Sequence, residues 1–436
     1  MREMKDSGVE WIGVIPEGWT IERLQWHVSE IKESNKPEKT RQVLSLTNKR
    51  GVIPYEEKGA QGNVAKEDYS QYKLAYPGTI VANSMNILIG SVGRCDYFGC
   101  VSPVYYVYKP NEGENLAFID YIFQMEQFQK ELRRYANGIL EIRLRVPSDG
   151  ILKREIAFPT KEAQEKIVHC LNQKCTQIDT LIQNVQTQIE KLKAYKQSLI
   201  TEVVTKGLDP TVPMKDSGVD WIGEIPEHWQ ITRLKHLYDT SSGSPVRVGP
   251  FGSALPSSEL TDEGVWVYNQ RTVIDQNFST NNTFVSPEKA SELTSFSVYP
   301  KDILITTRGS IGKTAIVPNN APKGILHPCV IRFRIADDKM DRVLLSLIFN
   351  ETNICQGQIM DMSNSTTIEV LYSYSLKEIW IPCPPTYEQG EILQQVKKII
   401  QNFARLIAIK QAKIEKLEQY KRSLIYEYVT GKKEVI

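Results

Sequence analysis

Apolar positions in two long segments of the chain step by three and four residues. In the first segment they fall at Ile182, Val185, Ile189, Leu192 and Leu199, and in the second at Ile407, Ile414, Leu417 and Leu424. This spacing is the a/d pattern of a coiled-coil seam and predicts two long helices, the first from about Thr160 to Thr205. Neither helix is apolar on all sides, so each needs a partner, and the simplest partner is the other helix.

A lysine interrupts the seam once in each segment, at Lys196 and at Lys421. Such a residue can act as a register device, or its stem can lie along the seam with the charged head in water. Each helix is expected to contain about 45 residues and to extend about 65–70 Å at 1.5 Å per residue.

The chain is built from two copies of one unit. Residues 4–16 (MKDSGVEWIGVIP) and 214–226 (MKDSGVDWIGEIP), here called the opening motifs, agree at eleven of thirteen positions. The helical ends repeat as well, as IEKLKAYKQSLI from Ile189 and IEKLEQYKRSLI from Ile414. A repeat of this length indicates duplicated domains. We therefore expect four consecutive parts: residues 1–155, 156–213, 214–380 and 381–436.

The middle of each copy has a different pattern. Residues 20–155 and 230–380 carry β-branched and aromatic runs bounded by Gly, Pro and Asn, which predict short strands. Helical stretches are expected at 117–135 and 341–356, so each middle is a mixed α/β domain and the fold class is α+β. The segments 76–94 and 299–313 share a G-S-x-G-[KR] element, with four extra residues ahead of it in the first copy. Elsewhere the middles diverge, which indicates that they recognise different things.

Composition narrows the protein class. Of 436 residues, 41% are hydrophobic and 24% charged, as in soluble globular proteins. No apolar run spans a membrane, and the opening residues resemble no secretory signal. Seven unpatterned cysteines predict free thiols and a cytoplasmic location, and five scattered histidines predict no metal site. A net charge of +1 argues against a nucleic-acid grip by the whole surface but leaves local basic faces possible.

Two motifs suggest catalysis and fail on inspection. GSIGKT (309–314) has Thr307 where a Walker A loop needs its first glycine, so it indicates either a tight turn or a DNA-backbone contact with Lys313 or Arg94. CPPT (383–386) lacks the amide and the aromatic residue of an amino-methyltransferase motif. We find no catalytic constellation.

Polar and basic side chains in the two middles are candidates for DNA contact. Arginine suits guanine and phosphate, and small polar side chains suit base edges, although such residues are also common in solvated loops and surface ion pairs. The candidates are Asn83, Ser84, Asn86, Ser91, Arg94, Arg143 and Arg145 in the first copy and Asn269, Arg271, Thr307, Arg308, Ser310, Lys313, Asn364 and Thr366 in the second.

Two tryptophans in or just after each opening motif could stack on bases or anchor a core. They are Trp11 and Trp19 in the first copy and Trp221 and Trp229 in the second. Because they belong to the constant part of each copy, the core interpretation is favoured.

The repeated motifs resemble those of the specificity subunit of type I restriction–modification systems, the HsdS family. The resemblance lies in SGVEWIGVIPEGW with SGVDWIGEIPEHW, the YPxDIL…RGSIGK element, the helix entry at Pro385, Glu388, Gln389 and Ile392, and IEKLxxYKxSLI. It covers essentially the whole chain. The first copy departs from the pattern, with Ala163 in place of the glutamate and no arginine before its G-S-V-G.

The resemblance implies a particular architecture and set of partners. Two target recognition domains in a pseudo-twofold arrangement are separated by two antiparallel helices in a coiled coil, and each domain reads one half of a split site in double-stranded DNA. Two methyltransferase subunits (HsdM) bring S-adenosylmethionine, and restriction subunits (HsdR) bring ATP and Mg²⁺ chemistry. The chain itself would be non-catalytic, cofactor-free and monomeric in isolation, and would not bind membranes.

The residues leave two other function classes open. A non-DNA interaction scaffold with a coiled-coil spacer fits the near-neutral charge, and a standalone enzyme would rest on GSIGKT and CPPT. The salt dependence of DNA binding separates the first from a DNA-reading subunit, since phosphate contacts weaken steeply with salt.

The helix pair could act as a ruler that sets the distance between the two domains. It would then have to hold them at half-sites roughly 34–36 Å apart, one turn of B-DNA.

Overall fold

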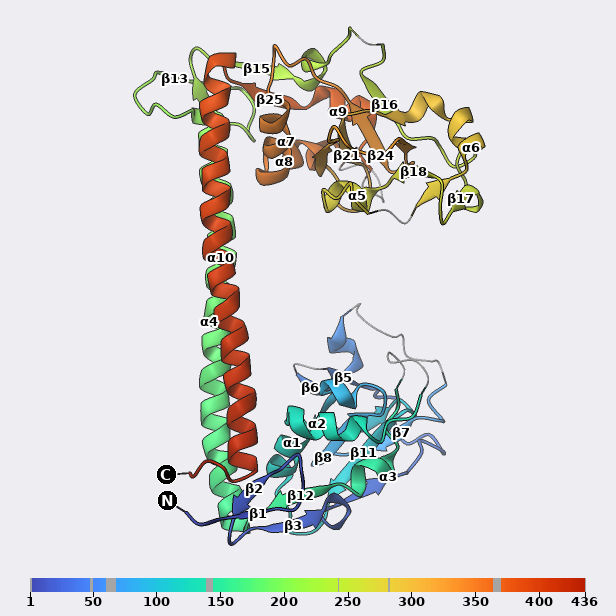
Figure 1. Cartoon of the computed structure of the whole chain (residues 1–436), viewed down its shortest axis with the longest axis vertical. Coiled ribbons are helices and arrows are strands. Elements are labelled where there is room, and N and C mark those ends of the chain that lie inside the picture. Colours follow the sequence, from blue (N-terminus) through green and yellow to red (C-terminus); the bar gives the residue numbers. More distant parts are fainter. Residues whose placement is uncertain are drawn as a thin grey trace. The chain divides into compact units, whose positions relative to one another are not determined.

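The computed structural model describes residues 2–47, 50–59, 68–138, 144–241, 243–280, 283–363 and 370–435. The chain forms two compact units, Met1–Gln186 with Gln411–Ile436, and Thr187–Lys410. Each unit holds one mixed domain and part of both long helices (Figure 1). The predicted α+β class, with two mixed domains and two long antiparallel helices, is confirmed. The four consecutive segment boundaries remain a prediction.

The long helices are α4 (Lys161–Lys206) and α10 (Thr386–Val429). Each is followed by a glycine with a positive φ, Gly207 at 75° and Gly431 at 71°, which is the usual left-handed end of a helix. In the first unit Asp179 of α4 meets Lys421 of α10, at 2.7 Å. In the second unit Lys410 donates to Gln188 at 2.8 Å, and the rings of Tyr195 and Phe403 lie 5.7 Å apart.

The predicted seam positions show graded burial, which suits a two-helix contact with one side open to water. Val185, Ile189 and Leu424 are buried, and Ile182, Leu192, Leu199, Ile407, Ile414 and Leu417 are half-buried. Each lysine head is paired, Lys421 in an exposed hydrogen bond and Lys196 in a partly buried one. Lys421 pairs with Asp179 on the opposite helix, and Lys196 pairs with Glu351 of the second mixed domain at 2.6 Å.

The first domain is centred on an antiparallel sheet in the order β4-β11-β8-β9. Its strands are β4 (Val28–Ile31), β11 (Tyr105–Pro110), β8 (Thr79–Asn83) and β9 (Val92–Cys95). Alternate residues of β8 face opposite cores: Ile80 and Ala82 pack with α1 (Leu116–Gln124) and α2 (Glu126–Arg133), whereas Val81 packs with β5 (Leu44–Thr47) and β6 (Gly51–Pro54). The single helix predicted at 117–135 is therefore two helices, broken where Met125 adopts an extended backbone.

The second domain repeats this plan. Its sheet runs β16 (Val246–Val248), β24 (Val330–Phe333), β21 (Ile303–Thr306) and β22 (Thr314–Ile316), and the predicted helix at 341–356 is again broken, into α7 (Arg342–Glu351) and α8 (Ile354–Ser363). It also carries a five-stranded sheet in the order β17-β19-β18-β23-β20. Those strands are β17 (Leu260–Thr261), β19 (Phe284–Val285), β18 (Val265–Tyr268), β23 (Gly324–Leu326) and β20 (Ser297–Val298).

Smaller elements complete the two units. In the first they are β1 (Met4–Asp6), β2 (Val14–Pro16), β3 (Thr20–Arg23), β7 (Lys73–Ala75), β10 (Gly99–Val101), α3 (Ser148–Leu152) and β12 (Glu155–Phe158). In the second they are β13 (Met214–Asp216), β14 (Glu224–Pro226), β15 (Gln230–Arg233), α5 (Gln270–Ile274), α6 (Pro287–Glu292), α9 (Ser373–Glu378) and β25 (Trp380–Cys383). The pairs β3–β12 and β15–β25 are equivalent antiparallel ribbons.

The opening motifs form hairpins at the ends of the long helices. In the first unit Trp19 lies against Gly431, and in the second Trp229 lies against Gly207, so close that a Cβ on either glycine would approach the indole to 3.0–3.1 Å. The core interpretation is correct for these two buried tryptophans and for Trp11, which packs on the core of the first unit. Trp221 differs: it is 41% exposed, lies flat on Gly357 and donates to Asp361.

Neither a membrane-spanning helix nor a metal-binding cluster is found among the described residues. No helix among the described residues is long and apolar enough to cross a membrane. The same described ranges contain no group of three or more His, Cys, Asp or Glu side chains placed to hold a metal ion. All seven cysteines are free thiols.

Candidate nucleic-acid interface

The hairpin between the last two strands of each central sheet carries most of the predicted contacts. The Asn83 amide donates to Ser91 and the Thr306 amide to Lys313, both at 3.0 Å, so these pairs are equivalent. Gly90 then matches Gly312, and their φ angles are 81° and 79°. The structure therefore corrects the letter-based alignment of G-S-V-G-R with G-S-I-G-K, because Arg94 does not occupy the place of Lys313.

The loop lengths are corrected by the same register. Ala82 pairs with Val92 and Ile305 with Thr314, which leaves residues 83–91 and 306–313 between these paired positions. The first hairpin is thus longer by one residue, not by four. Alignment by residue identity paired the wrong glycines. Glycine is needed where the backbone turns left-handed, and each hairpin contains a second glycine nearby.

GSIGKT is a strand-to-strand turn. Gly309 and Gly312 both have positive φ, the Gly312 amide donates to the Thr306 carbonyl at 3.0 Å, and the chain continues into β22 rather than into a helix. A phosphate loop needs the following helix N-terminus, so the tight-turn interpretation is correct. Contact of the turn with DNA backbone remains a prediction.

A second segment runs beside each hairpin. The Val146 amide donates to Ser84 and the Leu371 amide to Thr307, both at 2.9 Å. Residues 145–149 and 370–374 are therefore equivalent across the two domains. This contact brings Arg145 beside Ser84, and Arg308 forms a backbone bridge with Val370. Two chain segments distant in sequence thus form one surface in each domain.

The predicted contacts of the first domain differ widely in exposure. Asn83, Ser84 and Ser91 are buried, and the Asn83 side chain accepts from the Met85 amide at 3.0 Å, so its oxygen supports the turn. Asn86 and Arg145 are exposed on the surface that the two segments form. Arg143 lies outside the described residues.

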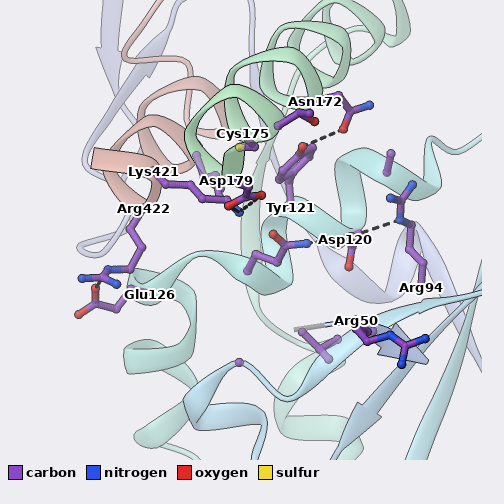
Figure 2. Close-up of a pocket in the computed structure, with 18 of the residues that line it drawn as sticks. Arg50, Arg94, Asp120, Tyr121, Glu126, Asn172, Cys175, Asp179, Lys421 and Arg422 are labelled. Atoms are coloured by element: carbon purple, nitrogen blue, oxygen red, sulfur yellow. Dashed lines mark hydrogen bonds and ion pairs between the residues drawn. The ribbon is translucent and has the colours of Figure 1, made fainter. Parts of the chain in front are cut away.

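Arg94 points into a groove of the first unit. The groove encloses about 830 Å³ between α1, α2, β9 and the halves of α4 and α10 that belong to this unit (Figure 2). The Arg94 Nε lies 3.4 Å from Asp120, a carboxyl that is 6% exposed and receives a hydrogen bond from Gln124. Burial raises the pKa of Asp120 to about 6, although Arg94 and Gln124 act in the opposite direction.

The same groove contains the contacts that attach the first domain to its helices. Tyr121 of α1 donates to Asn172 of α4 at 2.8 Å, and Arg422 of α10 pairs with Glu126 of α2 at 3.3 Å (Figure 2). Arg94 therefore pairs with Asp120 in the wall of this groove and does not lie at the tip of the hairpin.

The second domain presents more of its predicted cations. Arg308, Ser310 and Lys313 are exposed on the hairpin, and Lys313 reaches the Asn350 carbonyl at 3.3 Å. Thr307 is buried. Asn269 caps α5 by accepting from the Thr272 amide, and Arg271 pairs with Asp275 at 3.2 Å, so both are engaged locally. Asn364 and Thr366 lie outside the described residues.

Other arginines of the second domain belong to its interior. Asp302, 1% exposed, lies 2.6 Å from Arg334 and 3.6 Å from Arg332. Arg332 also donates to the Ser297 carbonyl, and burial lowers its pKa, with Asp302 acting against that shift. Arg332 is buried and Arg334 is half-buried, and both form one ion-pair cluster with Asp302.

Sequence reasoning missed an exposed aromatic pair beside the second hairpin. The rings of Tyr372 and Tyr374 stack with centroids 5.2 Å apart and an interplanar angle of 9°. Both rings remain substantially exposed, Tyr374 at 67%. The signal available in the sequence was the alternation in LYSYS (371–375), which begins in the segment that meets the hairpin and runs into the start of α9.

Comparisons with known proteins agree with one another. A family described as type I restriction modification DNA specificity domain matches residues 248–419. The putative type I restriction enzyme MjaX specificity subunit of Methanocaldococcus jannaschii is 23% identical over 448 aligned residues, which cover 97% of this chain and 95% of that protein. The MjaVIII specificity subunit of the same organism is 26% identical over 284 residues, covering 64% of this chain and 62% of that protein.

A solved structure supports the fold. It is described as the structural basis underlying complex assembly and conformational transition of the type I R-M system, and it matches with a TM-score of 0.65 at 16% identity over 95% of this chain and 98% of that one. Together the sequence matches show that the chain is similar to type I restriction–modification specificity subunits.

Proposed function

We propose that the chain reads a bipartite, asymmetric site in double-stranded DNA, one half with each mixed domain. The observation that carries this proposal is the pair of equivalent hairpin surfaces, held by the same backbone hydrogen bonds but lined by different side chains. Base readout depends on side chains, whereas position depends on the scaffold. A common scaffold with unlike side chains therefore suits two unlike half-sites.

The chain would act with partner subunits. Two methyltransferase subunits would supply S-adenosylmethionine and methylate adenine, and restriction subunits would supply ATP-dependent, Mg²⁺-dependent cleavage. The chain would hold none of these cofactors, would carry no catalytic residue and would position its partners on the DNA in the cytoplasm. The motifs GSIGKT and CPPT offer no support for catalysis, since one is a strand-to-strand turn and the other joins β25 to α10.

Reconstitution with the methyltransferase subunits tests the proposal. Mapping methylated adenines in a host that expresses both should yield one split motif with unlike halves and a fixed gap. DNA binding by the complex should fall steeply between 50 and 200 mM salt, by about 10³-fold if roughly six phosphates are contacted. Binding that is indifferent to salt, or methylation without a split motif, would favour the protein-interaction scaffold instead.

The gap between the half-sites offers a separate test of the helices as a ruler. Four residues inserted after Lys193 add roughly one helical turn, about 6 Å, and should lengthen the preferred gap by about one or two base pairs. An unchanged gap in single-molecule methylation mapping would contradict the ruler but leave DNA reading intact.

A further inference from the structure

We propose that Tyr372, Tyr374 and Arg308 form a DNA-contacting cluster that carries part of the second domain's sequence readout; the proposal rests on the function proposed above. Neither tyrosine is among the DNA contacts predicted from the sequence. They lie in the segment 370–374, which is hydrogen-bonded to the hairpin, and Arg308 lies across a backbone bridge from Val370 in that segment. The cluster thus joins two parts of one surface.

The tyrosine pair is exposed, and its two rings are stacked. Tyr372 and Tyr374 are 46% and 67% exposed, yet they hold their rings nearly parallel. Among the described residues, no hydrogen bond reaches either hydroxyl and no ion pair reaches Arg308. Ordered aromatic rings with free hydroxyls are common at recognition surfaces because they give a large contact area for little loss of side-chain freedom.

Charge favours DNA as the occupant over a protein surface of mixed charge. Residues 307–313 and 370–374 contain two cations, Arg308 and Lys313, and no acidic residue. A guanidinium can take a guanine edge or a phosphate, a tyrosine hydroxyl can donate to a phosphate, and a ring can pack on a thymine methyl.

The equivalent positions of the first domain differ in chemistry. Because Val146 matches Leu371, Pro147 stands in place of Tyr372 and Asp149 in place of Tyr374. Asp149 is engaged by Lys153 at 3.0 Å. One domain thus presents a cation with two aromatic rings where the other presents a proline and a paired carboxylate, which is the kind of difference that separates two half-site specificities.

Substitution of the cluster tests the proposal in the complete complex with methyltransferase subunits. Exchanging residues 20–155 for those of another specificity subunit identifies the half-site of the first domain, and the other half belongs to the second. Tyr372→Ala with Tyr374→Ala should weaken binding to the mapped duplex tenfold or more and reduce discrimination against base changes in the second half only. Arg308→Ala should also lower the slope of binding against salt by about one.

A matched control comes from the same unit. Tyr387 is 76% exposed on the first turn of α10, so Tyr387→Ala removes an exposed tyrosine away from the hairpin and should leave affinity and discrimination unchanged. Unaltered discrimination in the first half shows that the first unit is folded, and unchanged hydrogen exchange of β21 shows the same for the second unit. The proposal is overturned if the double variant binds and discriminates like wild type, or if it only weakens association with the methyltransferase. If the wild-type complex shows no split motif, the proposed function itself fails.

Discussion

The two mixed domains share equivalent backbone hydrogen bonds but differ in the side chains at the equivalent positions. Thr79 and Asp302 occupy equivalent places, since their amides donate to the carbonyls of Tyr76 and Tyr299. Thr79 caps this turn with a hydroxyl, whereas Asp302 caps it with a carboxylate that also holds two arginines. The comparison teaches that the scaffold is specified by main-chain hydrogen bonds, which leaves side chains free to diverge even in the interior.

Removal of the capping side chain should have unequal effects in the two domains, and this is the largest difference that we expect. Asp302→Ala leaves Arg332 buried without its counter-charge and should cost about 3–5 kcal/mol. Thr79→Ala loses one hydrogen bond to the Tyr76 carbonyl and should cost about 0.5–1.5 kcal/mol. Hydrogen exchange of β21 and β8 in the full chain measures each loss locally. Equal losses would show that the Asp302 cluster adds no more stability than the Thr79 hydrogen bond.

The groove of the first unit should make its stability depend on pH. Asp120 matches Ser346 of the second domain, because Asn115 and Asp341 are the equivalent N-caps of α1 and α7. Ser346 lies 2.9 Å from the Thr314 hydroxyl and carries no charge. The raised pKa of Asp120 means that the folded state favours the proton. Its stabilising contribution is present below about pH 4 and is lost as pH rises through about 6.

Asp120→Asn should therefore stabilise the first unit at neutral pH. The gain is up to about 3 kcal/mol at pH 7.5, because a shift of one pKa unit corresponds to about 1.36 kcal/mol. It should shrink when the same hydrogen-exchange comparison is made at pH 5, and Ser346→Ala should show no such pH dependence. A gain of the same size at both pH values would mean that Asp120 does not titrate in this range.

The seam lysines should give the smallest difference. Lys196 and Glu351 are each about a quarter exposed, whereas Asp179, the partner of Lys421, is 55% exposed. Lys421→Met should change the thermal midpoint little, within about 1 kcal/mol, because exposed ion pairs contribute little. Lys196→Met should cost more, since its pair with Glu351 is less exposed. Melts at low and at 1 M salt check the ranking, and a larger loss for Lys421→Met would reverse it.

The sequence was most informative where a pattern is local. The seam spacing placed α4 within one residue of its observed ends, because helical periodicity acts over a few residues. The breaks at Met125 and Thr352 were missed, since neither carries a proline or glycine signal. Tertiary packing decides such breaks.

The candidate site was harder to predict because its partners are distant in sequence. The roles of Arg332 and Arg334 depend on Asp302, some thirty residues earlier, and the tyrosine pair meets the hairpin only through a contact between Thr307 and Leu371. The glycine-rich sequences of the two hairpins suggested an alignment that the strand register corrects. Residue type indicated which chemistry was present, but only the fold showed which side chains were exposed together.

Domain exchange tests the central claim most directly. Residues 20–155 would be replaced by the corresponding middle of a similar type I specificity subunit, and methylated adenines would be mapped in a host that supplies the methyltransferase. One half of the split motif should change while the other half and the gap stay as they were. A change in both halves, or in neither, would contradict independent reading by two unlike domains on a shared scaffold.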